Sequence, residues 1–119
     1  MVPVLPVQDL QKTIDFYKDK LGFYNEWLWG ENAAGLERDY LRFIFKRDTE
    51  FAKFMNSDSF EFALMVFVTG IDHIYKEYQT NGVEMITALE EKPWGMKEFV
   101  VKDVNGYLLR FAERKEEEE

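Results

Sequence analysis

The sequence predicts an α+β fold in which two similar modules form curved mixed sheets around a cleft. Each module has the order strand, helix, strand, strand, strand (βαβββ). Residues 9–22 and 70–83 place apolar side chains at helical spacing, and each stretch is followed by segments typical of strands. The letters LRF at 41–43 recur at 109–111, which favours an internal repeat. We expect a helix to cover one face of each sheet and the other face to turn toward a shared hollow.

The first module begins with VPVLPV at 2–7, a β-branched segment whose prolines suit an edge strand. A helix is expected after Asp9, a residue type favoured at the N-cap, and Gly22 is expected to end it. The module then continues with a strand at 23–29, a loop at 30–35, one bent strand or two short strands at 36–46, and a polar connection at 47–59.

The second module repeats this order over about 60–115, so that residues 1–115 are expected to form one domain. Gly82 is expected to end its helix. Asn-Gly at 105–106 supplies the positive φ that a tight hairpin needs. The expected elements are a strand at 60–68, a helix at 70–83, strands at 84–90, 96–102 and 107–113, and an acidic tail at 116–119.

Composition excludes several classes of protein. The chain of 119 residues has no cysteine, which excludes disulfides and thiolate metal sites. No apolar run approaches the roughly 20 residues of a membrane helix, and the first residues lack a signal peptide, so a cytoplasmic protein is expected. A net charge of −8 argues against nucleic-acid binding. An aromatic content of 17% is a surplus that indicates a hydrophobic cavity or a subunit interface.

Four segments carry a resemblance to a known family. They are VLPVQDLQKTIDFYKDKLGF (4–23), AGLERDYLRFIF (34–45), LMVFVTGIDHIYKEY (64–78) and PWGMKEFVVKDVNGYLLRF (93–111). Together they resemble the vicinal oxygen chelate (glyoxalase/bleomycin resistance/dioxygenase) superfamily, and within it the bleomycin resistance proteins. The resemblance implies two βαβββ modules, a homodimer and ligand pockets between subunits. It also implies a division of function: enzyme members carry a divalent metal, whereas antibiotic-binding members lack it and hold an aromatic, cationic drug by stacking and charge.

The metal-ligand positions of the family fall near Val2, Arg42, Ala63 and Arg110. Valine and alanine offer no donor atom, and a guanidinium repels a cation, so we expect neither a metal nor another cofactor. The single histidine, His73, lies inside the second helix and is expected to be a partly exposed helix residue. If the register slips by one residue, the carboxylates that could supply ligands instead are Glu61, Glu98 and Glu113.

Strand alternation assigns Arg110 a face. Leu109 and Phe111 are expected to pack as core against the helix, so Arg110 faces the hollow. A buried arginine must be paired, and Glu98 on the neighbouring strand is the expected partner. The pair either contributes to a ligand site or only braces the sheet.

Aromatic and sulfur-containing side chains supply the expected ligand wall. Met65 and Phe67 share a face of their strand, at positions where bleomycin-binding relatives carry large aromatics. Trp94, between Pro93 and Gly95 in a turn, is positioned to stack on a planar or cationic ligand or to pack in a dimer interface. Trp27 and Trp29 share one side of their strand and belong either to the hollow or to the core.

The resulting hypothesis is a metal-free homodimer that sequesters a planar or cationic small molecule, with bleomycin-type antibiotics as the first candidates and with no nucleic-acid or membrane partner. Carboxylates such as Glu98 and Glu26 are expected to set its charge preference. A metal-dependent glyoxalase- or dioxygenase-type enzyme is the alternative, and a scaffold or regulatory dimer with a vestigial pocket is a third. The predicted ligand-binding residues are Trp94, Arg110, Glu98, Phe67, Met65, Trp29 and Trp27.

Overall fold

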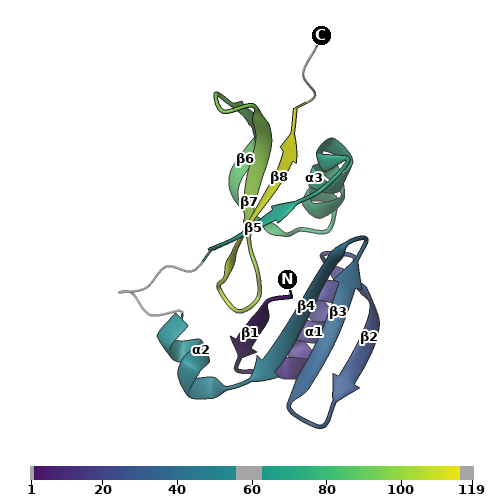
Figure 1. The fold of residues 1–119 in the computed structure, drawn as a ribbon, viewed down its shortest axis with the longest axis vertical. Coiled ribbons are helices and arrows are strands. Elements are labelled where there is room, and N and C mark those ends of the chain that lie inside the picture. The colour runs from purple at the N-terminus through teal and green to yellow at the C-terminus, as the bar shows by residue number, and fades with distance from the viewer. Residues whose placement is uncertain (1, 56–62, 116–119) are drawn as a thin grey trace. The chain divides into compact units, whose positions relative to one another are not determined.

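The computed structural model describes residues 2–55 and 63–115. In this part of the chain the predicted order of two βαβββ modules is present, with one additional helix between them (Figure 1). The first module comprises β1 Val4–Val7, α1 Leu10–Asp19, β2 Tyr24–Trp29, β3 Ala33–Arg38 and β4 Leu41–Arg47. The second comprises β5 Ala63–Phe67, α3 Ile71–Thr80, β6 Glu84–Lys92, β7 Met96–Lys102 and β8 Leu108–Arg114, and the additional helix is α2 Thr49–Met55.

The strands form two four-stranded mixed sheets with the same topology. Sheet 1 has the order β1-β4-β3-β2, and sheet 2 has the order β5-β8-β7-β6. In each sheet the first strand of the module pairs in parallel with the last, and the other neighbours are antiparallel. The predicted α+β class with mixed sheets is therefore confirmed.

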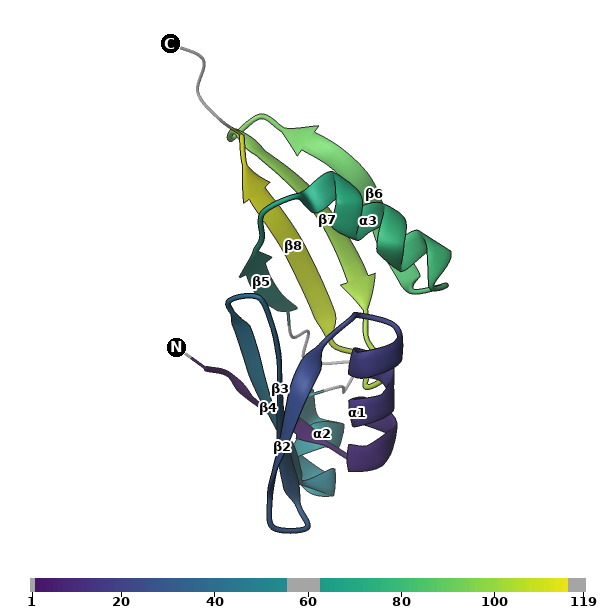
Figure 2. The ribbon, with the colours of Figure 1, turned by 90° about the vertical axis from the view of Figure 1, so that its right-hand side faces the viewer.

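The described residues divide into two compact units. Unit 1 holds sheet 1, α1 and α2 and takes in the turn Val104–Gly106, and unit 2 holds sheet 2 and α3. In each unit the helix lies along one face of its own sheet (Figure 2). Among the described residues, no helix has both the length and the apolar content needed to cross a bilayer.

An aromatic cluster forms the core of unit 1, between α1 and sheet 1. Tyr17 of α1 is fully buried and packs its ring against Phe23, Phe43 and Phe45. The helix begins where expected, because the backbone N–H of Lys12 donates to the side chain of the N-cap residue Asp9 at 3.0 Å.

Unit 2 has an equivalent core between α3 and sheet 2. Tyr78 of α3 packs against Phe99 and Phe111, which stack on each other with ring centroids 5.1 Å apart. The N-terminus of α3 is capped from a distant strand, because the carboxylate of Glu113 accepts from the backbone N–H groups of Gly70 and Ile71 at 3.0 Å each.

Two local expectations are changed by the structure. The prediction of a polar connection at 47–59 is wrong for Thr49–Met55, which form α2. This helix begins where the Asp48 carboxylate accepts from the N–H of Phe51 at 3.1 Å, and it buries Ala52 and Met55. The segment at 36–46 is two strands, and β3 already begins in the expected loop. The expected strand at 60–68 is β5 over its described part, and residues 60–62 lie outside the described residues.

Candidate functional site

The face of sheet 2 opposite α3 gathers five of the predicted site residues, and we call it the open face. It is defined by Met65, Phe67, Glu98 and Arg110, with Trp94 from the turn before β7. The parallel register of β5 and β8 sets Met65 beside Arg110. The helix-facing positions that alternate with them, such as Phe111, are buried. Met65 and Phe67, in contrast, are 46% and 58% exposed.

A carboxylate at the centre of the open face binds two side chains. The Nη1 of Arg110 donates to Oε1 of Glu98 at 2.9 Å, and the indole Nε1 of Trp94 donates to Oε2 at 2.7 Å. The predicted pairing of Arg110 with Glu98 is thus confirmed. The burial is reversed relative to expectation, because Glu98 is 2% exposed whereas the side chain of Arg110 is 43% exposed.

The donors around Glu98 keep it ionised. Burial alone raises the pKa of the Glu98 carboxyl, but the hydrogen bonds from Trp94 and Arg110, with the charges of Arg110 and Lys92, hold its pKa below the usual value. The carboxylate is therefore shielded from water by side chains that also neutralise it. A buried carboxylate bound in this way fixes the positions of its partners.

The turn before β7 holds Trp94 outward, with 60% of the residue exposed. Gly95 has φ +84°, a backbone conformation that side-chain-bearing residues rarely adopt. Its N–H donates to the carbonyl of Lys92 at 3.1 Å, and its carbonyl accepts from the N–H of Lys115 at 2.9 Å. The ammonium of Lys92 lies 5.9 Å from the centroid of the Trp94 ring. The indole is therefore held at its ring nitrogen, and backbone hydrogen bonds of the adjacent Gly95 hold the turn that carries it, while the ring stays accessible.

Trp27 and Trp29 lie in unit 1, on the face of sheet 1 opposite α1. Neither is among the buried core residues, so the alternative that they form core is wrong. The ring of Trp27 lies directly on Gly35, where a Cβ atom would stand 2.1 Å from Trp27 Cζ2. Trp29 is exposed, with its ring centroid 6.4 Å from that of Trp27.

The same face of sheet 1 carries a second arginine–carboxylate–indole cluster that sequence reasoning did not identify. Nη2 of Arg42 donates to Oε2 of Glu37 at 3.2 Å, and the Arg42 guanidinium lies 5.6 Å from the Trp27 ring centroid. Asn25 donates to the other Glu37 oxygen, and the hydrogen bonds from Asn25 and Arg42 lower the pKa of Glu37. The signal was present in the sequence, because the repeated LRF places Arg42 and Arg110 at equivalent positions.

The positions expected to hold a metal do not fit one. Val2 and Ala63 offer no donor atom, and Arg42 and Arg110 are guanidinium groups bound to carboxylates. Glu113, one of the alternative ligands expected for a register slip, caps α3 instead. Glu61 lies outside the described residues, and in the described part of the chain no three His, Cys, Asp or Glu side chains are grouped to bind a metal.

The carboxylates expected to attract a cation are occupied in this structure. Both oxygens of Glu98 accept hydrogen bonds, and Glu26 pairs with Lys18 at 3.2 Å. His73 lies on the exposed side of α3, as predicted. The two carboxylates that the sequence suggested for binding a cationic ligand, Glu98 and Glu26, are therefore already paired with other side chains.

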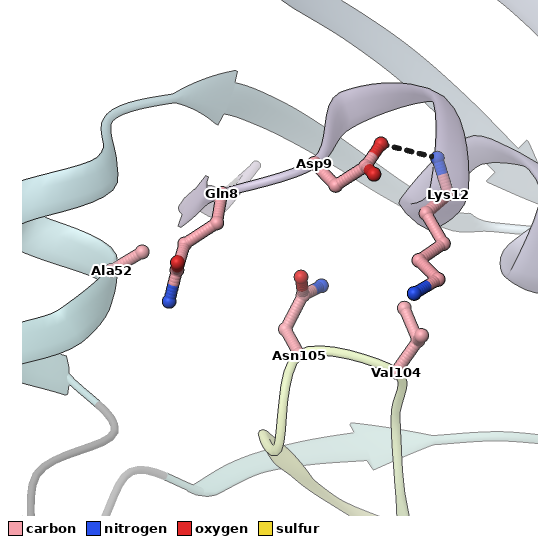
Figure 3. A pocket seen from close by; sticks show the side chains of 6 residues that line it. All are labelled: Gln8, Asp9, Lys12, Ala52, Val104 and Asn105. Atoms are coloured by element: carbon pink, nitrogen blue, oxygen red, sulfur yellow. Dashed lines mark hydrogen bonds between the residues drawn. The ribbon is translucent and has the colours of Figure 1, made fainter.

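A hollow of about 210 Å³ in unit 1 contains none of the predicted site residues (Figure 3). Its wall includes Asp9, whose side chain is the α1 cap, so this acceptor is already used (Figure 3). The lining residues are Gln8, Asp9, Lys12, Ala52, Val104 and Asn105. We do not regard it as the functional site.

Sequence comparison places the chain beside one family. The model described as Glyoxalase/Bleomycin resistance protein/Dioxygenase superfamily matches residues 2–111. Proteins named bleomycin resistance protein from Geobacillus stearothermophilus and Staphylococcus aureus are each 27% identical over 133 aligned positions, covering 95% of this chain and 95% of theirs.

Solved structures share the fold at lower identity. A bleomycin resistance determinant encoded on the transposon Tn5 superposes with a TM-score of 0.80 at 22% identity, covering 98% of both chains. TioX from Micromonospora sp. ML1 gives a TM-score of 0.76 at 21% identity, covering 100% of this chain and 98% of its own. The predicted two-module architecture is shared with both.

Proposed function

Because the chain belongs to the glyoxalase/bleomycin resistance protein/dioxygenase superfamily, as its motifs predicted, we propose that it sequesters a planar, antibiotic-like small molecule without a metal ion. Its relatives named bleomycin resistance protein match nearly its full length, so bleomycin-type drugs are the first ligands to test. The pockets are assigned to the interface of a homodimer, and the site of action to the cytoplasm.

The observation that carries this proposal is the held but exposed indole of Trp94. Its Nε1 is bound to Glu98, so the ring orientation is set before a ligand arrives, and 60% of the residue is exposed. Met65 and Phe67 extend the apolar surface on the same face. A planar ring stacked on such an indole gains about 0.5 to 1.5 kcal/mol beyond the area it buries.

The donor chemistry favours binding over metal-dependent catalysis. A catalytic divalent metal needs about three protein ligands around an open position. The family positions carry Val2, Arg42, Ala63 and Arg110 instead, and both guanidinium groups repel a cation.

A thermal-shift screen of the purified protein tests the proposal. Bleomycin-type and other planar antibiotics are added at about 100 times their dissociation constant, where binding to the folded state adds about 2.7 kcal/mol of stability. For a chain of 119 residues this is a rise in melting temperature of about 10 °C. Trp94→Leu should reduce the shift, whereas Tyr40→Leu, at a fully exposed position in unit 1, should leave it unchanged.

Two further measurements accompany the screen. Elemental analysis should find no stoichiometric zinc, nickel, iron or manganese, and analytical ultracentrifugation should find a dimer. A protein that no drug stabilises, or one that loses a stoichiometric metal on Glu98→Ala substitution, would contradict the proposal and favour the scaffold or the enzyme hypothesis respectively.

A further inference from the structure

We propose that the open face of sheet 2 selects planar ligands that carry an anionic oxygen group beside the ring, such as aromatic carboxylates, and disfavours cationic ones. This inference rests on the proposed function and specifies its ligand class. It follows from which charges on the open face are available to a ligand and which are already bound.

Glu98 is not available to a ligand. The residue is 2% exposed, and its two oxygens accept from Arg110 and from Trp94. Its pKa lies below the usual value, so it remains an anion that these donors neutralise. A ligand cation has no uncovered oxygen of Glu98 to approach, and Glu98 is assigned the role of a positioning residue for the indole and the guanidinium.

Arg110, in contrast, keeps donors available. A guanidinium has five N–H donors, and among the described residues the only side-chain hydrogen bond of Arg110 is the one from Nη1 to Glu98. Its side chain is 43% exposed and lies beside Met65 on the neighbouring strand. The remaining N–H groups can therefore donate to a carboxylate held above the apolar surface, an arrangement that suits planar oxygen anions.

The surroundings of Trp94 also oppose a cationic ligand. The Lys92 ammonium already lies 5.9 Å from the centroid of the indole ring and makes a cation–π interaction with it, so the ring attracts a further cation less strongly. The exposed carboxylate on this face, Glu90, forms an ion pair with Lys92. A ligand cation stacked on the ring would approach both Lys92 and Arg110 and would be repelled by their positive charges. Among these residues no unpaired carboxylate offsets that repulsion.

Sheet 1 repeats the arrangement at the equivalent position of the first module. Glu37 is bound by Arg42 and Asn25, and Arg42 is half-exposed beside the ring of Trp27. In both sheets the carboxylate is engaged and the guanidinium faces outward next to an indole. The pattern thus occurs at the equivalent arginine position of both modules, and its exposed guanidinium in each case supports a recognition surface rather than a pair that only braces one sheet.

Three matched probes separate the possibilities by calorimetric titration at pH 7. They are 2-naphthoate, the neutral 2-naphthamide and the cationic 2-naphthylmethylammonium. We expect the wild-type protein to bind the carboxylate at least tenfold more tightly than the ammonium compound. Arg110→Met should weaken binding of the carboxylate by about tenfold to a hundredfold, the range for a lost charge-assisted hydrogen bond, and should change that of the amide much less.

Two variants serve as controls. Arg114→Met removes the same charge from the same strand, four residues away, and should change binding of the carboxylate by less than about threefold because water and salt screen it. Arg110→Lys keeps the charge but loses the planar fork, and should give an intermediate affinity. Circular dichroism confirms that each variant is folded before titration.

The outcomes distinguish this inference from the proposed function. Equal or tighter binding of the ammonium probe overturns the inference and leaves sequestration of planar ligands standing. An Arg110→Met variant that binds the carboxylate as well as the wild type does the same. If no naphthalene probe binds up to millimolar concentration, the inference is also overturned, while the antibiotic screen decides the proposed function separately.

Discussion

Replacing Glu98 with alanine removes the carboxylate that Trp94 and Arg110 both bind. Two hydrogen bonds with a charged partner are lost, each of which contributes about 1.5 to 3 kcal/mol when it is fully buried. Water replaces part of this loss, because Trp94 is 60% exposed and the Arg110 side chain is 43% exposed. The expected decrease in the free energy of unfolding at pH 7 is therefore about 1 to 3 kcal/mol, rather than the full sum.

The pH dependence of this loss has a defined sign. The pKa of Glu98 is lower in the folded protein than its ordinary value of 4.5, because the bonds from Trp94 and Arg110 outweigh the effect of burial. The stabilisation from the ionised carboxylate is thus complete above the unfolded pKa and is lost as the pH falls through the folded pKa. The difference between wild type and Glu98→Ala should be largest at neutral pH and shrink below about pH 4.5.

Urea denaturation followed by far-UV circular dichroism from pH 3.5 to 7.5 measures this difference. Glu91→Ala is the matched control, since Glu91 lies on the same sheet and pairs with Lys115 in an ion pair in which both side chains are exposed. It should cause no measurable change in stability. If Glu98→Ala is as stable as the control, or if its effect is independent of pH, the assignment of Glu98 as the group that holds Trp94 and Arg110 is wrong.

Three further predictions concern the elements that position the site. Gly35→Ala places a Cβ atom 2.1 Å from the Trp27 ring and should displace the ring, lowering the free energy of unfolding by about 1 to 3 kcal/mol. In a variant with no other tryptophan the Trp27 emission should shift to the red, and an unchanged emission maximum would contradict the contact. Glu113→Ala should cost about 1 kcal/mol and speed hydrogen exchange at the first turn of α3 but not of α1, so equal exchange in both would argue against the cap. Phe99→Ala, at a fully buried ring stacked in the core of unit 2, should cost about 3 to 5 kcal/mol by chemical denaturation, and a loss below 1 kcal/mol would refute its place in the core.

The repeat and the strand periodicity were sufficient to predict the architecture. They place two helices and most strands within a few residues of their observed bounds, and β7 Met96–Lys102 coincides with its predicted range. Alternation also assigned Arg110 to the face opposite the core and chose Glu98 as its partner, because in a sheet the face of a side chain depends only on its position along the strand.

The remaining features depend on contacts that periodicity does not encode. The bond from Trp94 to Glu98 depends on the conformation of the turn at Gly95, which no alternation rule sets. The face of sheet 1 on which Trp27 lies could not be predicted by alternation, because the register shifts between Tyr24 and Trp27. A glycine within a strand, such as Gly35, nevertheless indicates that another group packs closely on the backbone. Helix α2 was missed because its short, mixed sequence buries only two side chains, Ala52 and Met55.

A titration of a variant in which Trp94 is the only tryptophan, Trp27→Phe with Trp29→Phe, tests the central claim most directly. The planar antibiotics that the thermal screen selects are added to protein pretreated with a chelator, and fluorescence is recorded. We predict saturable quenching of the Trp94 emission with one ligand per chain, unchanged when zinc or nickel is supplied. Binding that appears only after a divalent metal is restored, or saturable binding with no change in Trp94 emission, would contradict a metal-free site built on this indole.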